Sequence, residues 1–282
     1  MANETTYALI SSLLPDIYEA ALMYAQETFI MPQLVTVYTD QTGMQSRKLS
    51  EYSPGTVTAG LGETTDLTPQ EFDRALLSTL QPAEIGTQFV ITDRRLDSDD
   101  VDVMADLAQH IGYTIFRQIE SDLLSQFNGF TGGSVGASAN RLDWPAIFKA
   151  RAMLANAAVP PPYNLVLSEY QYYDLATDAN IAGLSNPAPL RIRDDIQSRY
   201  YVASVGDIDV YTTSSLGESD PLVGGMFNRG ALALDIRRAM RIELQRDASL
   251  RATEVNATAV YGHGLRRATW GVKVISDGTA PA

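Results

Sequence analysis

One short segment of the chain matches a catalytic pattern. Residues 132–136 (GGSVG) satisfy the G-x-S-x-G spacing of serine hydrolases, and His263 follows later with acids in between. That mechanism requires a sharp strand-to-helix turn at the serine, which exposes the hydroxyl beside an oxyanion hole. Here Ser134 instead follows a long predicted helix, within a glycine- and serine-rich stretch at 128–140. Because such composition is typical of flexible connections, we predict a tether between two halves rather than a nucleophile.

Other residue types that support catalysis are scarce. The chain has no cysteine and only two histidines, His110 and His263, which excludes a disulfide, a thiol nucleophile and a multi-histidine metal cage. His263 lies between two glycines on a predicted strand, and we interpret it as structural. The sequence contains no phosphate-binding glycine loop with lysine, no dinucleotide fingerprint and no His-Glu-x-x-His motif. We therefore predict that the protein is not an enzyme and uses no metal or cofactor.

Composition indicates an ordinary globular chain. The 282 residues are 45% hydrophobic and 20% charged, enough for one large domain or two smaller ones. The net charge of −13 argues against a stand-alone DNA-binding protein with a basic surface. The first basic residue is Arg47, so a secretory signal is not expected, and no run of about 18 apolar residues suggests a membrane span. We expect a soluble, intracellular product with no membrane partner.

The charges are unevenly distributed along the chain. Residues 1–46 hold five acids and no base, whereas residues 229–282 hold nine bases against five acids, a net charge of +4. Ends of opposite charge indicate that one end meets the other, within a chain or between chains. Arginine dominates the bases, and its planar guanidinium suits bidentate pairing with carboxylates at interfaces.

The elements that must position these residues follow from hydrophobic periodicity. Residues 5–30 have helical spacing interrupted by Pro15, and residues 33–38 predict a short strand. Residues 40–80 are polar and punctuated by glycine and proline, too long for an ordinary loop in a compact domain. We predict that this segment is either an extended hairpin projecting from the body or a disordered linker.

The strongest helix signal lies at 98–127, where apolar residues recur every three or four positions behind a cluster of aspartates that suits a helix start. The segment after the glycine-rich stretch alternates between helices and strands. We predict helices at 144–157, 169–177 and 191–198, and strands at 164–167 and 207–212. From Gly230 onward the pattern is strand-like to the end of the chain.

In this order the segments resemble the major capsid protein of tailed bacteriophages, the Hong Kong 97 fold. The resemblance covers essentially the whole chain and is most specific at 84–124 and 259–276. It implies an α+β fold with an antiparallel peripheral sheet, completed by the strands after Gly230, and a mixed α/β axial domain. The implied parts are an N-terminal arm (1–40), an extended loop (41–80), a peripheral domain (81–142 and 228–282) with the 98–127 helix as its spine, and an axial domain (143–227).

The resemblance also implies a function. Such a subunit self-assembles as hexamers and pentamers into an icosahedral shell that encloses double-stranded DNA without reading its sequence. Scaffolding, portal and decoration proteins are the further partners that it implies, and the virion capsid is assembled in the host bacterial cytoplasm. Two alternatives stay open: an encapsulin-like cargo container of the same fold, and a serine hydrolase that uses Ser134.

Within this framework the uneven charge predicts contacts between subunits. The expected acids lie on the arm and the loop: Glu19, Glu27, Glu63, Asp66 and Glu71. The expected arginines lie on the C-terminal strands: Arg237, Arg238, Arg241, Arg246, Arg266 and Arg267. The family sometimes joins a loop lysine covalently to a neighbour's asparagine, and Lys48 and Asn256 supply these residue types. Short polar segments also contain such residues by chance, so the pair is a candidate and no more.

Overall fold

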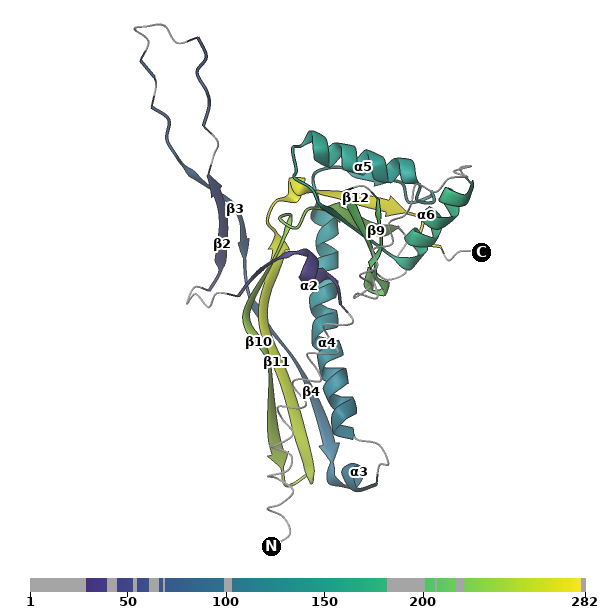
Figure 1. Cartoon of the computed structure of the whole chain (residues 1–282). Helices are drawn as coiled ribbons and strands as arrows, with labels where there is room; N and C mark the ends of the chain where they lie inside the picture. The colour runs from purple at the N-terminus through teal and green to yellow at the C-terminus, as the bar shows by residue number, and fades with distance from the viewer. Residues whose placement is uncertain are drawn as a thin grey trace.

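The computed structural model of the chain describes residues 29–39, 45–52, 55–60, 66–67, 69–98, 103–181, 201–205, 207–216 and 221–279. Two sheets and a long helix form the body, and a two-stranded hairpin projects from it (Figure 1). Most of the predicted helix at 5–30, and all of the one at 191–198, lies outside the described residues.

A four-stranded sheet has the strand order β1-β10-β11-β4. β10 (Leu232–Asp247), β11 (Ala252–Leu265) and β4 (Ala83–Thr92) pair antiparallel, while β1 (Thr36–Tyr38) pairs parallel with β10. Along most of β11 buried side chains alternate with half-buried ones, as expected for a strand with one face on a core. The prediction that residues after Gly230 form strands is confirmed.

The long helix α4 (Val103–Ser125) packs against β11 and β4 of this sheet and confirms most of the helix predicted at 98–127. A short helix, α3 (Asp93–Ser98), precedes it, and residues 99–102 lie outside the described part, with most of the predicted aspartate cap. The side chains at helical spacing are buried: Leu107, Ile111, Ile115, Ile119 and Leu123. Each large aliphatic side chain removed from water contributes about 1.5–3 kcal/mol, so this stripe holds the helix on the sheet.

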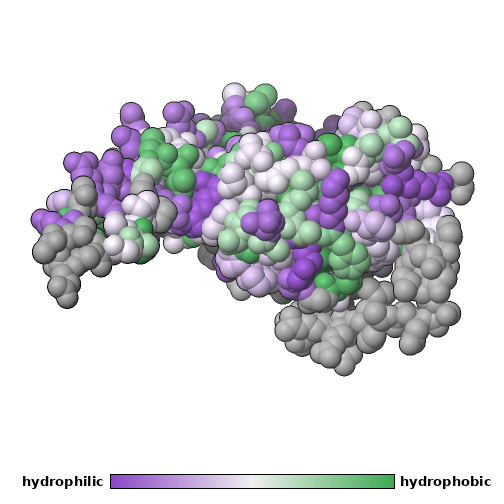
Figure 2. Space-filling view, turned by 90° about the horizontal axis from the view of Figure 1, so that it is seen from above, coloured by the Kyte–Doolittle hydropathy of each residue, from purple (hydrophilic) through white to green (hydrophobic). Residues whose placement is uncertain are grey.

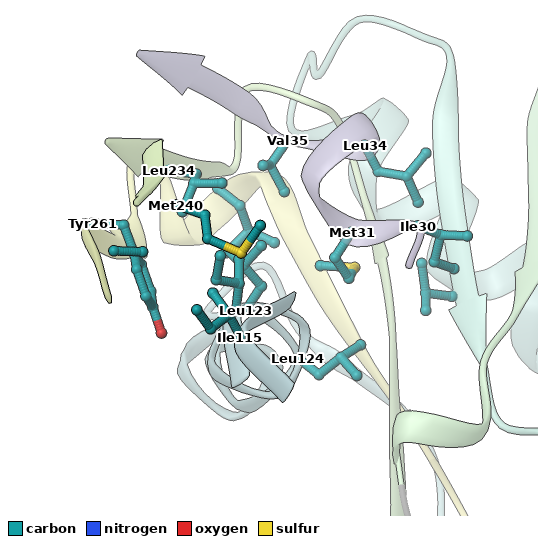
Figure 3. Packing of buried hydrophobic residues seen from close by; sticks show 14 of the residues in the cluster. Ile30, Met31, Leu34, Val35, Ile115, Leu123, Leu124, Leu234, Met240 and Tyr261 are labelled. Atoms are coloured by element: carbon teal, nitrogen blue, oxygen red, sulfur yellow. The ribbon is translucent and has the colours of Figure 1, made fainter. Parts of the chain in front are cut away.

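The strand predicted at 33–38 is only partly correct. Residues Met31–Leu34 form a helical turn, α2, and the strand β1 begins at Thr36. Pro32 lies at the start of the turn, where its fixed φ favours a helical backbone. Met31 and Leu34 are both buried in the core shared with α4, and Figure 3 shows the side chains of the turn and of β10 gathered beside the helix.

The second sheet has six strands in the order β5-β12-β9-β6-β8-β7. The strands are β5 (Ser134–Gly136), β6 (Tyr163–Leu167), β7 (Tyr201–Val205), β8 (Ile208–Thr212), β9 (Leu222–Phe227) and β12 (Gly271–Ser276). Helix α5 (Trp144–Asn156) packs on β5 and β12, and Asp143 caps it by accepting a 3.0 Å hydrogen bond from the Ala146 amide. The predicted elements at 144–157, 164–167 and 207–212 are confirmed.

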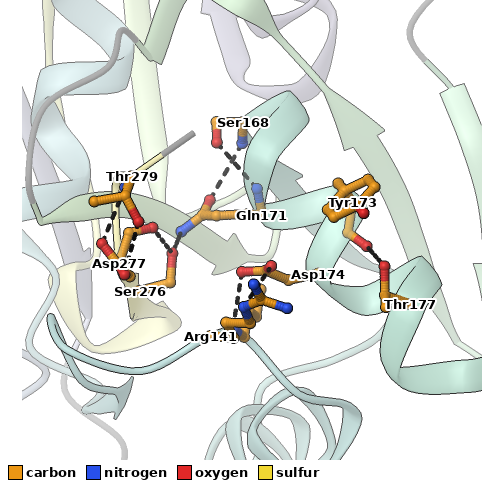
Figure 4. A network of polar contacts seen from close by, with 10 residues as sticks. Arg141, Ser168, Gln171, Tyr173, Asp174, Thr177, Ser276, Asp277 and Thr279 are labelled. Carbon is orange, nitrogen blue, oxygen red and sulfur yellow. Dashed lines mark hydrogen bonds and ion pairs between the residues drawn. The ribbon is translucent and has the colours of Figure 1, made fainter. Parts of the chain in front are cut away.

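Helix α6 (Glu169–Ile181) confirms the helix predicted at 169–177 and begins with a reciprocal cap. The Gln171 side chain accepts a hydrogen bond from the Ser168 amide at 3.2 Å, while the Ser168 hydroxyl accepts from the Gln171 amide at 3.3 Å. The buried Gln171 amide group also donates to the Ser276 hydroxyl at 3.0 Å, which ties α6 to the end of β12 (Figure 4).

The prediction of a flexible tether at 128–140 is wrong, because this segment forms part of the second sheet. β5 pairs parallel with β12, and the Gly132 amide donates to the Gly271 carbonyl at 3.0 Å. A side chain at Gly132 would lie 2.6 Å from the carbonyl oxygens of Gly271 and Thr269. The glycines therefore allow close approach of two backbones rather than flexibility.

The strands after Gly230, which were expected to complete the peripheral sheet, are divided between the two sheets. β10 and β11 belong to the four-stranded sheet, but β12 lies in the six-stranded sheet between β5 and β9. The short 3-10 turn η3 (Ala268–Trp270) separates β11 from β12, and the Trp270 amide donates to the Arg267 carbonyl there at 3.0 Å. The C-terminal strands thus connect the two sheets.

The extended segment at 40–80 is a hairpin rather than a linker over its described residues. β2 (Arg47–Tyr52) and β3 (Arg74–Leu80) pair antiparallel, with one irregularity in register between Leu49 and Ser50. Figure 1 shows the pair extending away from the two sheets.

Candidate inter-subunit interface at the hairpin

The hairpin has two chemically different faces. Residues directly opposite each other on antiparallel strands share a face, and successive residues alternate between faces. We define the inner face by three pairs: Arg47 with Leu80, Leu49 with Ser78, and Glu51 with Ala75. We define the outer face by the other three: Lys48 with Thr79, Ser50 with Leu76, and Tyr52 with Arg74.

The first contact of the inner face is a buried ion-pair cluster. Asp235, fully buried on β10, lies between Arg47 (Nε to Oδ1, 3.0 Å) and Arg237 (Nε to Oδ2, 2.7 Å). The Arg47 guanidinium also lies 4.8 Å from the ring centroid of Tyr38 on β1. Charges withdrawn from water in this way are costly unless paired, so each member depends on the others.

Two further contacts secure the inner face. Leu49 and Leu80 are buried with Ala233 in a small hydrophobic cluster. Glu51 forms an ion pair with Arg267, whose guanidinium stacks 4.0 Å from the ring centroid of Trp270. We call these three contacts, Arg47–Asp235, the leucine cluster and Glu51–Arg267, the root clamp.

The outer face exposes apolar side chains to solvent. Tyr52 is 52% exposed and Phe72 76% exposed, and their rings stack with centroids 4.3 Å apart. Leu76 is also exposed, as are Val57 and Leu67 further along the hairpin. Figure 2 looks down on the molecule and shows hydrophobic side chains lying among hydrophilic ones. Exposed apolar groups concentrated on one projecting element mark an interaction surface.

The arginines predicted for inter-subunit contacts mostly have partners within their own chain. The ion pairs are Arg237–Asp235, Arg238–Glu84, Arg241–Glu243 (2.5 Å), Arg246–Asp93 (2.6 Å) and Arg267–Glu51. Of the six, only Arg266 has no side-chain partner among the described residues. The bidentate hydrogen bonds from Arg246 lower the pKa of Asp93. Sequence reasoning missed these partners. Glu84, Asp93 and Glu51 are far from their arginines along the chain, and no pattern singled out Asp235 and Glu243, which lie two residues from theirs.

The predicted acids lie partly beyond what the structure describes. Asp66 and Glu71 are exposed on the hairpin, whereas Glu19, Glu27 and Glu63 lie outside the described residues. Their pairing between subunits therefore stays a prediction. For the covalent candidate, Lys48 is exposed on the outer face, and Asn256 is half-buried on the central strand β11, opposite Glu243 and Gln88.

A buried acid on α4 was also missed by the sequence analysis. Glu120 is 0% exposed, and its Oε2 accepts a 2.9 Å hydrogen bond from the Met31 amide. Its other oxygen, Oε1, is buried and has no hydrogen-bond partner among the described residues. Burial raises the pKa of Glu120 to about 7, against the lowering effect of the amides of Met31 and Ile30. The spacing of four residues from Phe116 and from Leu124 is the signal that could have revealed this buried position.

The hydrolase arrangement is not formed. Ser134 is exposed within β5, opposite Lys273, and no strand-to-helix elbow surrounds it. His263 lies on the other sheet, with its Nδ1 3.8 Å from Asp122 of α4. Asp122 instead accepts a 2.5 Å hydrogen bond from the Tyr261 hydroxyl, and burial together with this bond raises the pKa of Tyr261.

Across the described residues, no group of three or more acids and histidines is placed to hold a metal ion. In the same part of the chain, no helix has the length and apolarity needed to cross a membrane.

Comparison with solved structures defines the class of the fold. The chain matches a structure of Mycobacterium phage Che8 with a TM-score of 0.69 and 16% identity, covering 90% of this chain and 93% of that one. It matches the capsid structure of cyanophage P-SCSP1u with a TM-score of 0.66 and 14% identity, covering 90% and 89% of the two chains. Among curated proteins no sequence matches. The chain therefore shares its α+β fold with these phage structures.

The family follows from the sequence itself. Residues 77–274 match the phage capsid protein family, and the chain belongs to that family. The resemblance to tailed-phage major capsid proteins is thereby confirmed.

Proposed function

We propose that the protein is a structural, non-enzymatic subunit that assembles as hexamers and pentamers into an icosahedral shell around the double-stranded DNA of a tailed phage. Family membership and fold support the capsid role. The observation that carries self-assembly is the hairpin, which is fixed to its own body on one face and exposes stacked aromatic rings on the other.

The parts of the chain have distinct roles in this proposal. The arm (1–40) reaches over a neighbour, and the extended loop (41–80) lies across the adjacent subunit. The four-stranded sheet and α4 form the peripheral domain, while 143–227 forms the axial domain at the centres of the capsomers. Since β5 and β12 join the six-stranded sheet, the two domains share strands. Scaffolding, portal and decoration proteins are further partners, and assembly takes place in the host cytoplasm.

Charge pairing between subunits is a second part of the proposal. The acids of the arm and the loop reach arginines on the C-terminal strands of a neighbour, and Arg266 is the best placed because its side chain has no partner among the described residues. Replacing both Glu63 and Asp66 with alanine should lower the thermal stability of assembled particles. Normal shells of unchanged stability would refute the pairing.

The net charge of −13 fits a shell that encloses DNA without gripping it. Strong phosphate binding would hinder both packaging and release.

The Lys48–Asn256 cross-link is tested by boiling purified particles in detergent. A ladder of multimers that disappears on Lys48→Arg would establish it, and a single subunit band would exclude it.

The container alternative has one observation in its favour. The chain also matches a virus-like particle from Pyrococcus furiosus with a TM-score of 0.61 and 11% identity, covering 93% of this chain and 98% of that one. Electron microscopy of the purified protein tests whether shells form at all, and the nucleic acid content of particles from infected cells distinguishes a virion from a container. Soluble subunits that never form shells would refute both.

A further inference from the structure

We infer that the outer face of the hairpin is a self-recognition surface, which binds an acid-bearing surface of a second copy of this chain through Tyr52, Phe72 and Leu76. The inference rests on the proposed assembly and names the side of the loop that makes the contact. Its basis is the register of β2 and β3 together with the exposure of each residue.

The root clamp determines which face is available. Arg47, Leu49 and Glu51 alternate along β2, and all three are held by the body of their own chain. The residues that alternate with them, Lys48, Ser50 and Tyr52, therefore lie on the opposite face. Lys48 and Tyr52 are exposed there, and Ser50 is half-buried. The hairpin cannot turn its aromatic side inward without breaking two ion pairs and a hydrophobic cluster.

The apolar part of the outer face is preorganised for binding. Tyr52 and Phe72 stack with an interplanar angle of 6°, which joins two side chains into one flat surface. Leu76 lies opposite Ser50 on the same face and is 58% exposed. Aromatic side chains held in place before contact lose little conformational freedom on binding, which favours them at the centres of interfaces.

The charged part of the outer face indicates the partner. Lys48 and Arg74 flank the apolar residues, and this face carries no acid. Neither cation forms a side-chain ion pair with the described residues. A partner surface must therefore combine apolar area with carboxylates. A second copy provides these carboxylates because the chain has 34 acids against 21 bases, and a capsid subunit meets other copies of itself.

The absence of cysteine allows a direct test, since an introduced cysteine is the only thiol in the chain. Thr79→Cys places a thiol on the outer face at an exposed position, and Ser78→Cys places the matched control on the inner face of the same strand, where the Ser78 hydroxyl is buried. Each variant is labelled with a benzophenone maleimide, assembled and irradiated. We expect covalent dimers of the chain from Thr79→Cys in particles, several-fold above those from Ser78→Cys, and none from either variant in unassembled subunits.

A second measurement covers the case in which the label disturbs assembly. Tyr52→Ser combined with Phe72→Ser should reduce particle yield about tenfold or more, because the buried aromatic area is lost. The exchange variant, Tyr52→Phe with Phe72→Tyr, keeps that area and should assemble normally. Thermal unfolding of the free subunit should be unchanged in both, since these side chains are exposed.

The outcomes separate the inference from the proposal beneath it. Particles that form with cross-links equal at both positions, or with an undiminished yield in the serine variant, would overturn the self-recognition surface and leave the capsid assignment intact. Cross-links to a protein other than this chain would also overturn it. A wild-type chain that never assembles would refute the proposed function, and the inference with it.

Discussion

Replacing Glu120 with glutamine should remove most of the pH dependence of subunit stability between pH 5 and pH 8. Glu120 is buried on α4 and accepts hydrogen bonds from the backbone where the N-terminal segment meets the helix. Because Oε1 has no hydrogen-bond partner in the described part of the chain, a protonated carboxyl and a glutamine amide leave the same position unsatisfied. Glutamine therefore mimics the neutral acid closely.

The magnitude follows from the pKa of Glu120, which rises from 4.5 to about 7 on folding. A raised pKa means that the folded state retains the proton which the unfolded chain releases, so stability is greatest below pH 4.5 and falls as pH rises to about 7. The full loss is about 3.4 kcal/mol for a shift of about 2.5 units, and roughly 2.5 kcal/mol of it falls between pH 5 and pH 8.

The assay is urea unfolding of unassembled subunits at pH 5, 6, 7 and 8, followed by circular dichroism. Wild-type stability should decline across the series, while that of Glu120→Gln should stay nearly level and exceed the wild type at pH 8. Glu169→Gln, which neutralises an exposed carboxylate at the start of α6, is the control and should follow the wild type.

Two results would refute this reasoning. One is a wild-type stability that is constant from pH 5 to pH 8. The other is a Glu120→Gln variant with the same slope as the wild type, which would place the titrating group elsewhere.

Three further predictions concern single substitutions in the subunit. Asp235→Ala removes a fully buried carboxylate shared by two half-buried arginines and should lower stability by about 3 kcal/mol or more, measured by urea unfolding; a loss below about 1 kcal/mol would contradict the clamp. Gly136→Ala places a side chain against the Ile275 carbonyl at a φ of +79° and should cost about 1–3 kcal/mol, with an unchanged melting temperature as the contrary result. Ser134→Ala should leave shell assembly unchanged, and any esterase activity abolished by that substitution would overturn the non-enzymatic assignment.

Sequence reasoning succeeded where the spacing of apolar residues along one segment determines its structure. The apolar spacing through Ile111, Ile115 and Ile119 predicted α4, because a single buried stripe produces both the helix and its packing. The hairpin was predicted because a polar segment punctuated by glycine and proline lacks a hydrophobic core of its own. In the structure β2 and β3 project from the body.

Sequence reasoning failed where the structure of a segment depends on residues far away in the sequence. The glycines around Ser134 indicate flexibility when considered alone, and only the proximity of β12, more than a hundred residues later, explains them. The ion pairs of Arg246 with Asp93 and of Arg267 with Glu51 likewise join segments far apart in the chain. Charge counts predicted that the arginines need acids but could not identify which acids fold close to them.

The buried cluster at Asp235 has a mechanical consequence. Asp235 lies opposite Tyr38 in the pairing of β1 with β10, and it also holds Arg47 at the first residue of the hairpin. The strand that leads out of the N-terminal segment and the strand that opens the hairpin are therefore both joined to one residue of β10, the first through strand pairing and the second through the carboxylate. A pull transmitted along β1 loads the same anchor that sets the direction of the hairpin. Tension on β1 is thus carried to Asp235, which also forms one of the three contacts of the root clamp.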